Sequence, residues 1–206
     1  MLLLVRHGES ESNAVGGHAT VNPDRLQLTA LGRHQAATMA TSLTWPPDAP
    51  QLEFWVSPLS RAMDTLAYVV QRYPQANVTP VPEAVEFTPF RLPVPTTREQ
   101  RAPLVRAYYE RGNPLEVGAQ GESFLEFYQR VARLLADAVQ QEPDMIVCHG
   151  GTICMLGLLL DPDFLRLEMA DAMAAFRKST ESGGVVNCEI VAIQPNTKSG
   201  RPNGHK

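Results

Sequence analysis

The stretch "LLLVRHG", residues 2–8, joins an apolar run to two basic residues and a glycine. Its four apolar residues, 2–5, are typical of a strand that is buried on both faces of a parallel sheet. An arginine, a histidine and a turn-forming glycine follow the strand directly. Because a cation and an imidazole are costly to keep at the end of a buried strand, we expect them to serve a binding or catalytic site.

Four further apolar runs predict strands, and the segments between them have the period of a helix. The clearest helical segments are 59–70 and 124–138, in which apolar residues recur every three to four positions. Strands that alternate with helices indicate an α/β fold. We predict a three-layer α/β/α sandwich with a mostly parallel central sheet. The further predicted strands are residues 53–56, 78–81, 145–148 and 185–193.

Capping residues predict where several helices begin. Thr29 is expected to cap a helix that runs from residue 30 to about residue 43. Ser57 followed by proline predicts a second helix start, and Ser123 with Glu126 forms a capping box for a third. A further apolar helix is expected over residues 152–160. The predicted helices therefore follow predicted strands along most of the chain.

Length and composition are those of one globular domain. The chain has 206 residues, of which 44% are hydrophobic and 19% are charged. We expect a single domain over residues 1–195 and a disordered tail over the polar residues 196–206. Residues 87–120, interrupted by prolines, are expected to form an excursion that covers a pocket mouth, with a helix over 98–111. A solvated surface excursion is the alternative for this segment.

Charge, cysteine content and hydropathy exclude several kinds of partner. The net charge is −4, and no basic block stands out that would follow a nucleic-acid backbone. The three cysteines form no CxxC pair, which suits a reducing cytoplasm. The longest apolar stretch, residues 153–160, is far too short to span a membrane. We expect a cytoplasmic protein without nucleic-acid or membrane partners, and the oligomeric state stays open.

Two of the predicted strands end in a histidine followed by a glycine. His7-Gly8 follows the first strand, and His149-Gly150 follows the strand 145–148, ahead of an apolar helix. In an open parallel sheet, ligands bind at the carboxyl ends of the strands, where helix N-termini offer free N–H groups to an anion. We therefore expect both histidines and the main chain of Gly150 to face one anion site.

Two arginines indicate that the anion is a phosphate. Arg6 precedes His7, and Arg61 falls in the first turn of the helix after the strand 53–56. Guanidinium groups bind pairs of phosphate oxygens and stay charged at any working pH. Their positive field disfavours protonation of a neighbouring imidazole, so His7 is expected to be neutral and nucleophilic. The residues predict attack of His7 on phosphorus, while Arg6, Arg61 and His149 hold the charged oxygens.

Four motifs, in order, make the chain similar to the histidine phosphatase superfamily, also called the phosphoglycerate-mutase-like family. Their order and approximate spacing agree from residue 2 to about residue 160. The resemblance implies this family's three-layer fold and phosphoryl chemistry that needs no metal or cofactor. The motifs are Arg6-His7-Gly8-Glu9-Ser10 with Asn13, Leu28-Thr29-Ala30-Leu31-Gly32, Ser57-Pro58-Leu59-Ser60-Arg61-Ala62, and His149-Gly150.

The resemblance also implies a role for each matching residue. His7 matches the histidine that becomes phosphorylated, and Arg6 and Arg61 match the phosphate-binding arginines. His149 matches the second histidine of the phosphate pocket. Asn13 matches a polar residue that contacts the transferred group. The site is therefore expected to combine a nucleophile with phosphate-binding groups from distant parts of the chain.

Two glutamates compete for the role of proton donor. The family uses an acidic residue after its third strand, and both Glu83 and Glu86 lie there. We favour Glu86 as the donor. The family's commoner pattern has a glycine-rich turn with a tryptophan after the acid, whereas this chain has Phe87-Thr88-Pro89-Phe90 and resembles a divergent branch of small phosphatases. This departure leaves the substrate open.

Three functions are consistent with these residues. Hydrolysis of a phosphomonoester through a phosphohistidine on His7 is preferred, because the chain is shorter than the family's mutases and lacks their usual acid motif. Phosphoryl transfer of the mutase type and non-catalytic binding of a phosphorylated ligand are the alternatives. A small phosphorylated metabolite is the expected partner, with a phosphoprotein as the alternative. A second anionic group of the substrate could meet Arg98, Arg101, Arg106 or Arg111, although interleaved glutamates also suit a solvated helix face.

Overall fold

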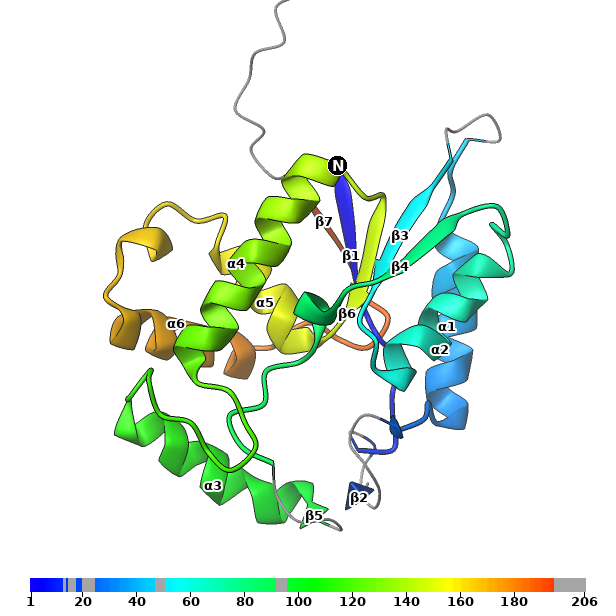
Figure 1. The fold of residues 1–206 in the computed structure, drawn as a ribbon. Coiled ribbons are helices and arrows are strands. Elements are labelled where there is room, and N and C mark those ends of the chain that lie inside the picture. Colours follow the sequence, from blue (N-terminus) through cyan, green and yellow to red (C-terminus); the bar gives the residue numbers. More distant parts are fainter. Residues whose placement is uncertain (13, 15–17, 20–24, 47–50, 92–95, 195–206) are drawn as a thin grey trace, which may run out of the picture.

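A computed structural model describes residues 1–12, 14, 18–19, 25–46, 51–91 and 96–194, in which strands and helices alternate (Figure 1). The strands are β1 (Leu2–Arg6), β2 (His18–Ala19), β3 (Glu53–Val56), β4 (Asn77–Pro80), β5 (Thr96–Thr97), β6 (Met145–Cys148) and β7 (Ile190–Ile193). The helices are α1 (Ala30–Ser42), α2 (Ser60–Val70), α3 (Arg98–Arg111), α4 (Phe124–Gln141), α5 (Gly150–Leu158) and α6 (Met169–Glu181), with short 3-10 turns η2 (Pro82–Ala84) and η3 (Phe164–Arg166).

The central sheet of the described residues has the order β4-β3-β6-β1-β7. Strand β1 lies parallel to β6, with Leu3 opposite Met145, and β3 lies parallel to both β6 and β4. Strand β7 runs antiparallel to β1 at one edge. The predicted α/β fold with a mostly parallel sheet is confirmed, and all five predicted strands contribute to it.

The last of these strands is shorter than the sequence predicts. Of the predicted strand 185–193, only residues 190–193 form β7. Cys188 has a left-handed backbone with a φ of 59°, and its N–H donates to the main-chain oxygen of Arg6. The Arg6 guanidinium in turn donates to the carbonyl of Val185. The prediction of a strand over 185–189 is wrong because these residues form a turn around the end of β1.

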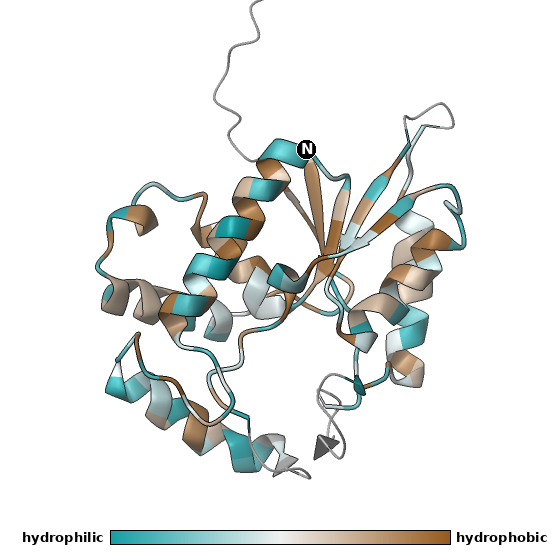
Figure 2. Cartoon of the chain, viewed as in Figure 1, coloured by the Kyte–Doolittle hydropathy of each residue, from teal (hydrophilic) through white to brown (hydrophobic). Residues whose placement is uncertain are grey.

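Helices cover the sheet on two faces, which gives three layers (Figure 1). Helices α4, α5 and α6 pack on one face, and α1 and α2 pack on the other. Alternate strand residues enter the two cores: Leu4 and Ile146 face the first, whereas Val5 and Val147 face the second. Figure 2 shows hydrophobic residues along β1 and on the inward faces of the helices, whereas β4 at the sheet edge also carries hydrophilic ones. Burial on both faces explains the apolar runs of the central strands β1 and β6.

The helix starts agree with the capping predictions in two of three places. The Thr29 side chain accepts the Gly32 N–H at the start of α1, and Ser123 and Glu126 form the capping box of α4. The predicted helix start at Ser57 is wrong, because α2 begins at Ser60 and has no side-chain cap. Because the Ser57 hydroxyl is 2.8 Å from a ring nitrogen of His149, it is engaged elsewhere.

The segment 87–120 contains α3, over the residues that the sequence predicts, and it is anchored to the core by aromatic rings. Tyr108 is buried, and its ring contacts those of Phe87 and Phe90. Phe87 also stacks on Phe127 of α4, with 4.6 Å between ring centroids. A capping box at Thr97, which the sequence analysis missed, fixes the start of α3. The helix is therefore held at both ends.

Two predictions fall on residues that the structure does not describe, namely Asn13 and the tail 196–206. Within the described part of the chain, no helix combines the length and the apolar character that crossing a membrane requires.

Candidate active site

A cavity of about 260 Å³ at the end of β1 gathers most of the predicted site residues. Of the predicted residues, Arg6, His7, Arg61 and Glu86 line it. They come from the end of β1, the first turn of α2 and the segment after η2. The sheet thus brings together side chains that lie far apart in the sequence. Ser10, Ser12 and Arg101 also line the cavity.

His7 is held in one orientation by its main chain and its ring. Its N–H donates to the Cys148 carbonyl over 3.0 Å, and its carbonyl accepts from the Asn187 side chain over 2.8 Å. The ring Nδ1 lies 2.7 Å from the Gly8 carbonyl, which can only accept, so Nδ1 carries the proton. The ring Nε2 therefore keeps its lone pair and accepts from Arg61 Nε at 3.2 Å.

The surroundings of His7 keep its ring neutral. Burial lowers its pKa from 6.5 to about 3, and the charges of Arg61 and Arg6 act in the same direction. Its hydrogen bond to Gly8 opposes this effect only in part. A desolvated imidazole beside fixed cations disfavours its charged form. At neutral pH the Nε2 atom is therefore unprotonated, and its lone pair accepts from Arg61.

Thr65 links the arginine to the glycine turn beside the histidine. Its Oγ1 accepts the Gly8 N–H at 3.0 Å and donates to the Arg61 carbonyl at 2.7 Å. Both Arg61 and Thr65 are buried on α2. The helix and the turn after β1 are thereby locked together, and the position of the guanidinium relative to His7 is fixed.

His149 lies beside His7 and is buried completely. The two rings stand edge to face, with centroids 5.0 Å apart. Burial lowers the pKa of His149 well below 6.5, and the charge of Arg61 adds to this effect. Its Nε2 is bonded to Ser57 Oγ, while its Nδ1 is buried without a hydrogen-bond partner among the described residues. His149 is thus a second neutral imidazole with one uncommitted nitrogen.

Gly150 and Gly151 begin α5 and let two side chains come close to its N-terminus. A Cβ atom on Gly150 would meet the Arg6 side chain at 3.5 to 3.6 Å. A Cβ atom on Gly151 would lie 2.5 Å from Glu86 Oε1, which is too close. The predicted phosphate-binding Gly150 therefore lies beside Arg6, although it is not among the residues that line the cavity.

Glu86 is fixed by main-chain donors and by its neighbours. Its carboxylate accepts the N–H of Phe87 at 2.9 Å and that of Gly151 at 3.2 Å. The preceding carbonyl, of Val85, accepts from Thr152 at 2.9 Å and from Arg130 at 3.0 Å. Helices α5 and α4 therefore clamp this segment from two sides and direct the carboxyl group of Glu86 into the cavity.

Glu83, the alternative proton donor, has a different place. It lies within η2 and is not among the residues that line the cavity. Its main-chain oxygen accepts from Arg130. The structure therefore brings Glu86, and not Glu83, into the same cavity as His7.

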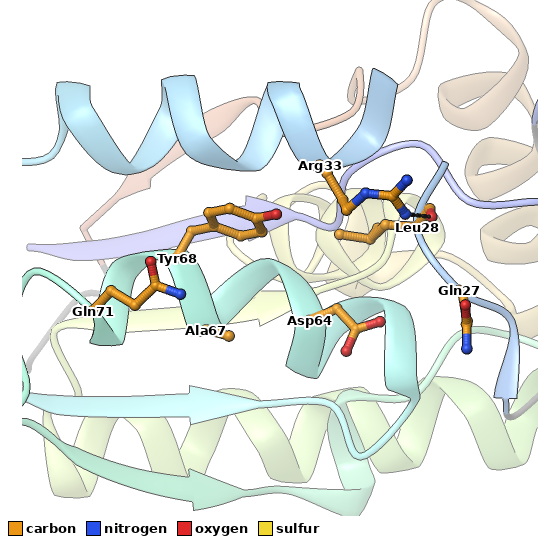
Figure 3. A pocket seen from close by; sticks show the side chains of 7 residues that line it. All are labelled: Gln27, Leu28, Arg33, Asp64, Ala67, Tyr68 and Gln71. Carbon is orange, nitrogen blue, oxygen red and sulfur yellow. Dashed lines mark hydrogen bonds between the residues drawn. The ribbon is translucent and has the colours of Figure 1, made fainter. Parts of the chain in front are cut away.

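A second cavity, of about 280 Å³, lies between α1 and α2 and has a different character (Figure 3). Arg33 and Asp64 give it one cation and one carboxyl group. Burial raises the pKa of Asp64. The Arg33 guanidinium is bonded to the Leu28 carbonyl, as the dashed line in Figure 3 shows. None of the predicted site residues lines this cavity, so the candidate site is the first one.

Sequence reasoning missed several residues of the site. Ser57 lies inside a recognised motif but was interpreted as a helix cap. Thr65, Arg130 and Asn187 carry no local signal, because their roles arise from contacts with distant segments. Arg101 was one of four arginines that the sequence could not tell apart.

The chain is thus an α/β protein with a cationic pocket that His7 lines and His149 adjoins, at the carboxyl edge of a mostly parallel sheet. Residues 2–177 match the histidine phosphatase superfamily (branch 1), and the chain belongs to this family. A curated relative, a phosphoglycerate mutase-like protein of Arabidopsis thaliana, is 28% identical over 162 residues, or 72% of this chain. The match covers 49% of that relative, so the chain spans about half its length.

Solved structures of phosphatases share the fold. The mycobacterial glucosyl-3-phosphoglycerate phosphatase is 25% identical with a TM-score of 0.65, and the match covers 92% of this chain and 87% of that chain. A putative alpha-ribazole-5'-P phosphatase from Escherichia coli is 26% identical with a TM-score of 0.64, covering 84% and 83%. The chain is thus similar to phosphatases that are named for different substrates.

Proposed function

We propose that this chain is a phosphatase that hydrolyses a phosphomonoester of a small metabolite through a phosphohistidine on His7, without a metal or cofactor. The observation that carries the proposal is the state of His7: a neutral ring in one tautomer, with the Nε2 lone pair facing a guanidinium. A protein that only binds phosphate needs the cations but does not need a nucleophile held in this way. The phosphatase names of the structural neighbours support the same activity.

The first step transfers the phosphoryl group to the enzyme. The Nε2 atom of His7 attacks phosphorus, a P–N bond forms, and the P–O bond to the alcohol breaks. Arg6 and Arg61, which line the cavity with His7, bind the phosphoryl oxygens. His149 does not line the cavity, but its ring packs against that of His7, and we assign its uncommitted Nδ1 a hydrogen bond to one of these oxygens. The Nδ1 proton of His7 stays on the ring, where the Gly8 carbonyl stabilises the developing positive charge.

Glu86 handles the proton in both steps. Its protonated carboxyl group gives a proton to the leaving alcohol oxygen. The resulting carboxylate then takes a proton from water, which attacks phosphorus and breaks the P–N bond. Inorganic phosphate leaves, and both His7 and the carboxyl group return to their starting states. No oxidant, reductant or metal ion is needed for this balance.

The first experiment tests the phosphohistidine. Purified protein is assayed with p-nitrophenyl phosphate between pH 5 and pH 7, and the enzyme is quenched in alkali, where phosphohistidine survives. We expect turnover that vanadate inhibits and a labelled enzyme, both of which disappear in His7→Ala. Turnover that persists in this variant would sink the mechanism. With labelled phosphoglycerate, isomerisation without release of phosphate would instead indicate a mutase.

The second experiment compares the two candidate proton donors. For Glu86→Gln we expect kcat to fall by about 100-fold to 10,000-fold with glycerol 3-phosphate, whose alkoxide is a poor leaving group. The loss should be much smaller with p-nitrophenyl phosphate, which needs little help from an acid. Glu83→Gln is the matched control and should keep the activity of the wild type. Equal losses on both substrates in Glu86→Gln would argue against proton donation by this residue.

A further inference from the structure

We propose that Arg101 binds a carboxylate on the alcohol part of the substrate, so that the enzyme selects phosphomonoesters of small organic acids. This inference rests on the phosphatase function proposed above and names its substrate class. The starting observation is that Arg101, from α3, lines the same cavity as the candidate nucleophile His7.

The position of Arg101 distinguishes it from Arg106 and Arg111 of the same helix. It is half-buried, whereas Arg106 and Arg111 are exposed. Tyr108, seven residues further on and therefore on the same face of the helix, is buried in the aromatic cluster. The side chain of Arg101 is thus on the helix face that turns toward the protein. Because a capping box and this cluster hold α3 in place, the backbone position from which the Arg101 side chain extends is fixed.

The bonding of Arg101 leaves its guanidinium available for a ligand. Its Nη2 donates to the main-chain carbonyl of Ser12 over 3.4 Å, which is long for such a bond. Arg111 shows the contrast, since it binds Glu116 through three hydrogen bonds of 2.5 to 3.0 Å. Among the ion pairs of the described residues, none involves Arg101. A carboxylate of the substrate can accept paired hydrogen bonds from the Arg101 guanidinium, as Glu116 does from Arg111.

The charges of the cavity fit a phosphate and one carboxylate together. Three guanidinium groups line it beside one acidic residue, Glu86, which in the proposed mechanism brings its own proton to the leaving oxygen. Both histidines are neutral. A phosphomonoester dianion offsets two of the three positive charges, and one carboxylate offsets the third. The cavity volume of about 260 Å³ lies below the range of about 300 to 1,000 Å³ of drug-sized ligand pockets, so a small acid suits it.

The test uses two substrates that differ in the carboxylate alone. 3-Phosphoglycerate carries it, and glycerol 3-phosphate has a hydroxymethyl group in its place. We expect the wild type to show a higher kcat/KM for 3-phosphoglycerate. In Arg101→Met this value should fall by about 10-fold to 100-fold, mostly through KM, because a charge-assisted hydrogen bond is lost. The loss with glycerol 3-phosphate should stay within about threefold, from the weaker field acting on the phosphate.

Two further variants make the result specific. Arg106→Met, on the exposed face of the same helix, should keep both the activity and the substrate preference. Arg101→Lys keeps the charge but not the planar fork, so it should restore part of the preference. A wild type without preference for the carboxylate, or a preference that survives in Arg101→Met, overturns the inference even if p-nitrophenyl phosphate is hydrolysed. Failure to hydrolyse p-nitrophenyl phosphate as well would remove the phosphatase function and this inference with it.

Discussion

At the scale of single residues, the site depends on hydrogen bonds that fix protons on particular ring atoms. Gly8 fixes the proton of His7 on Nδ1, and Ser57 occupies the Nε2 atom of His149. When the Ser57 hydroxyl donates, Nδ1 of His149 carries the proton and can donate to a phosphoryl oxygen. In the proposed mechanism, each imidazole is oriented through one nitrogen and acts through the other.

Replacement of Ser57 tests this division of labour. We expect Ser57→Ala to lower kcat by about tenfold or more, because the lost hydrogen bond leaves a buried ring nitrogen unpaired at a cost of about 1 to 3 kcal/mol. The nitrogen chemical shifts of His149, measured by NMR, should change from those of a single tautomer to an average of two. A variant with altered activity but an unchanged His149 spectrum would show that Ser57 acts by another route.

At the scale of elements, α4 positions the acidic residue without contacting it. The Arg130 guanidinium donates to the carbonyls of Glu83 and Val85 and pairs with Glu122. Its side chain is only 13% exposed, so these bonds are shielded from water. The segment that carries Glu86 thereby gains a rigid support from a helix that contributes no side chain to the cavity.

Removal of this support should reduce both stability and activity. For Arg130→Met we expect the free energy of unfolding to fall by about 1.5 to 3 kcal/mol, as for the loss of hydrogen bonds to a charged group. The kcat with glycerol 3-phosphate should fall more than that with p-nitrophenyl phosphate, because proton donation is the step that suffers. Arg133→Met, on the exposed face of the same helix, is the control for urea unfolding and kinetics. Equal kcat losses on both substrates would refute the positioning role.

The close contact between α1 and the turn after β1, at Gly32, leads to a second prediction for the elements. A Cβ atom on Gly32 would lie 2.0 Å from the main-chain oxygen of Glu9, so Gly32→Ala must push the two elements apart. We expect a loss of at least about 1 to 3 kcal/mol of stability, as for other overpacked sites. Gly157→Ala, where nothing lies within 4 Å, should instead stabilise α5 by about 0.5 to 1 kcal/mol. Thermal melts of both variants measure these changes. Shifts of the melting temperature with the same sign in both variants would contradict this account.

Local sequence signals predicted the helices and strands better than the tertiary contacts between them. Apolar runs located all five strands of the sheet, and Thr29 and Ser123 marked two helix starts. The same signals failed at Ser57 and at 185–189, where contacts with His149 and Arg6 decide the conformation. Of the site, the sequence placed Arg6, His7, Arg61 and Glu86 together, and they do share a cavity. It could not find Arg130 or single out Arg101, because tertiary packing alone distinguishes them.

At the scale of the whole molecule, the buried histidines connect stability to pH. The folded state keeps His7 neutral down to about pH 3, whereas the unfolded chain takes up a proton near pH 6.5. Well above pH 6.5 the His7 ring is neutral in both the folded and the unfolded state, and its protonation costs no stability. As the pH falls from 6.5 toward 3, the unfolded state binds a proton that the folded state does not bind, and the free energy of unfolding decreases. His149 acts in the same direction.

Urea unfolding at pH 7, 6, 5 and 4 measures this linkage. Well below pH 6.5, each such histidine lowers the free energy of unfolding by about 1.4 kcal/mol for each pH unit of acidification. We therefore expect His7→Asn to lose stability less steeply than the wild type as the pH falls through this range. The same slope in both proteins would show that the buried ring is protonated in the folded state.

The central position of β1 has a consequence for how the protein is made. Its two neighbours, β6 and β7, lie at residues 145–148 and 190–193, so β1 is translated long before the strands with which it pairs. Synthesis at about 5 to 20 residues per second leaves its apolar edges unpaired for roughly ten to forty seconds. During that time the unpaired edges of β1 stay exposed, which makes the nascent chain prone to aggregation and open to binding by chaperones.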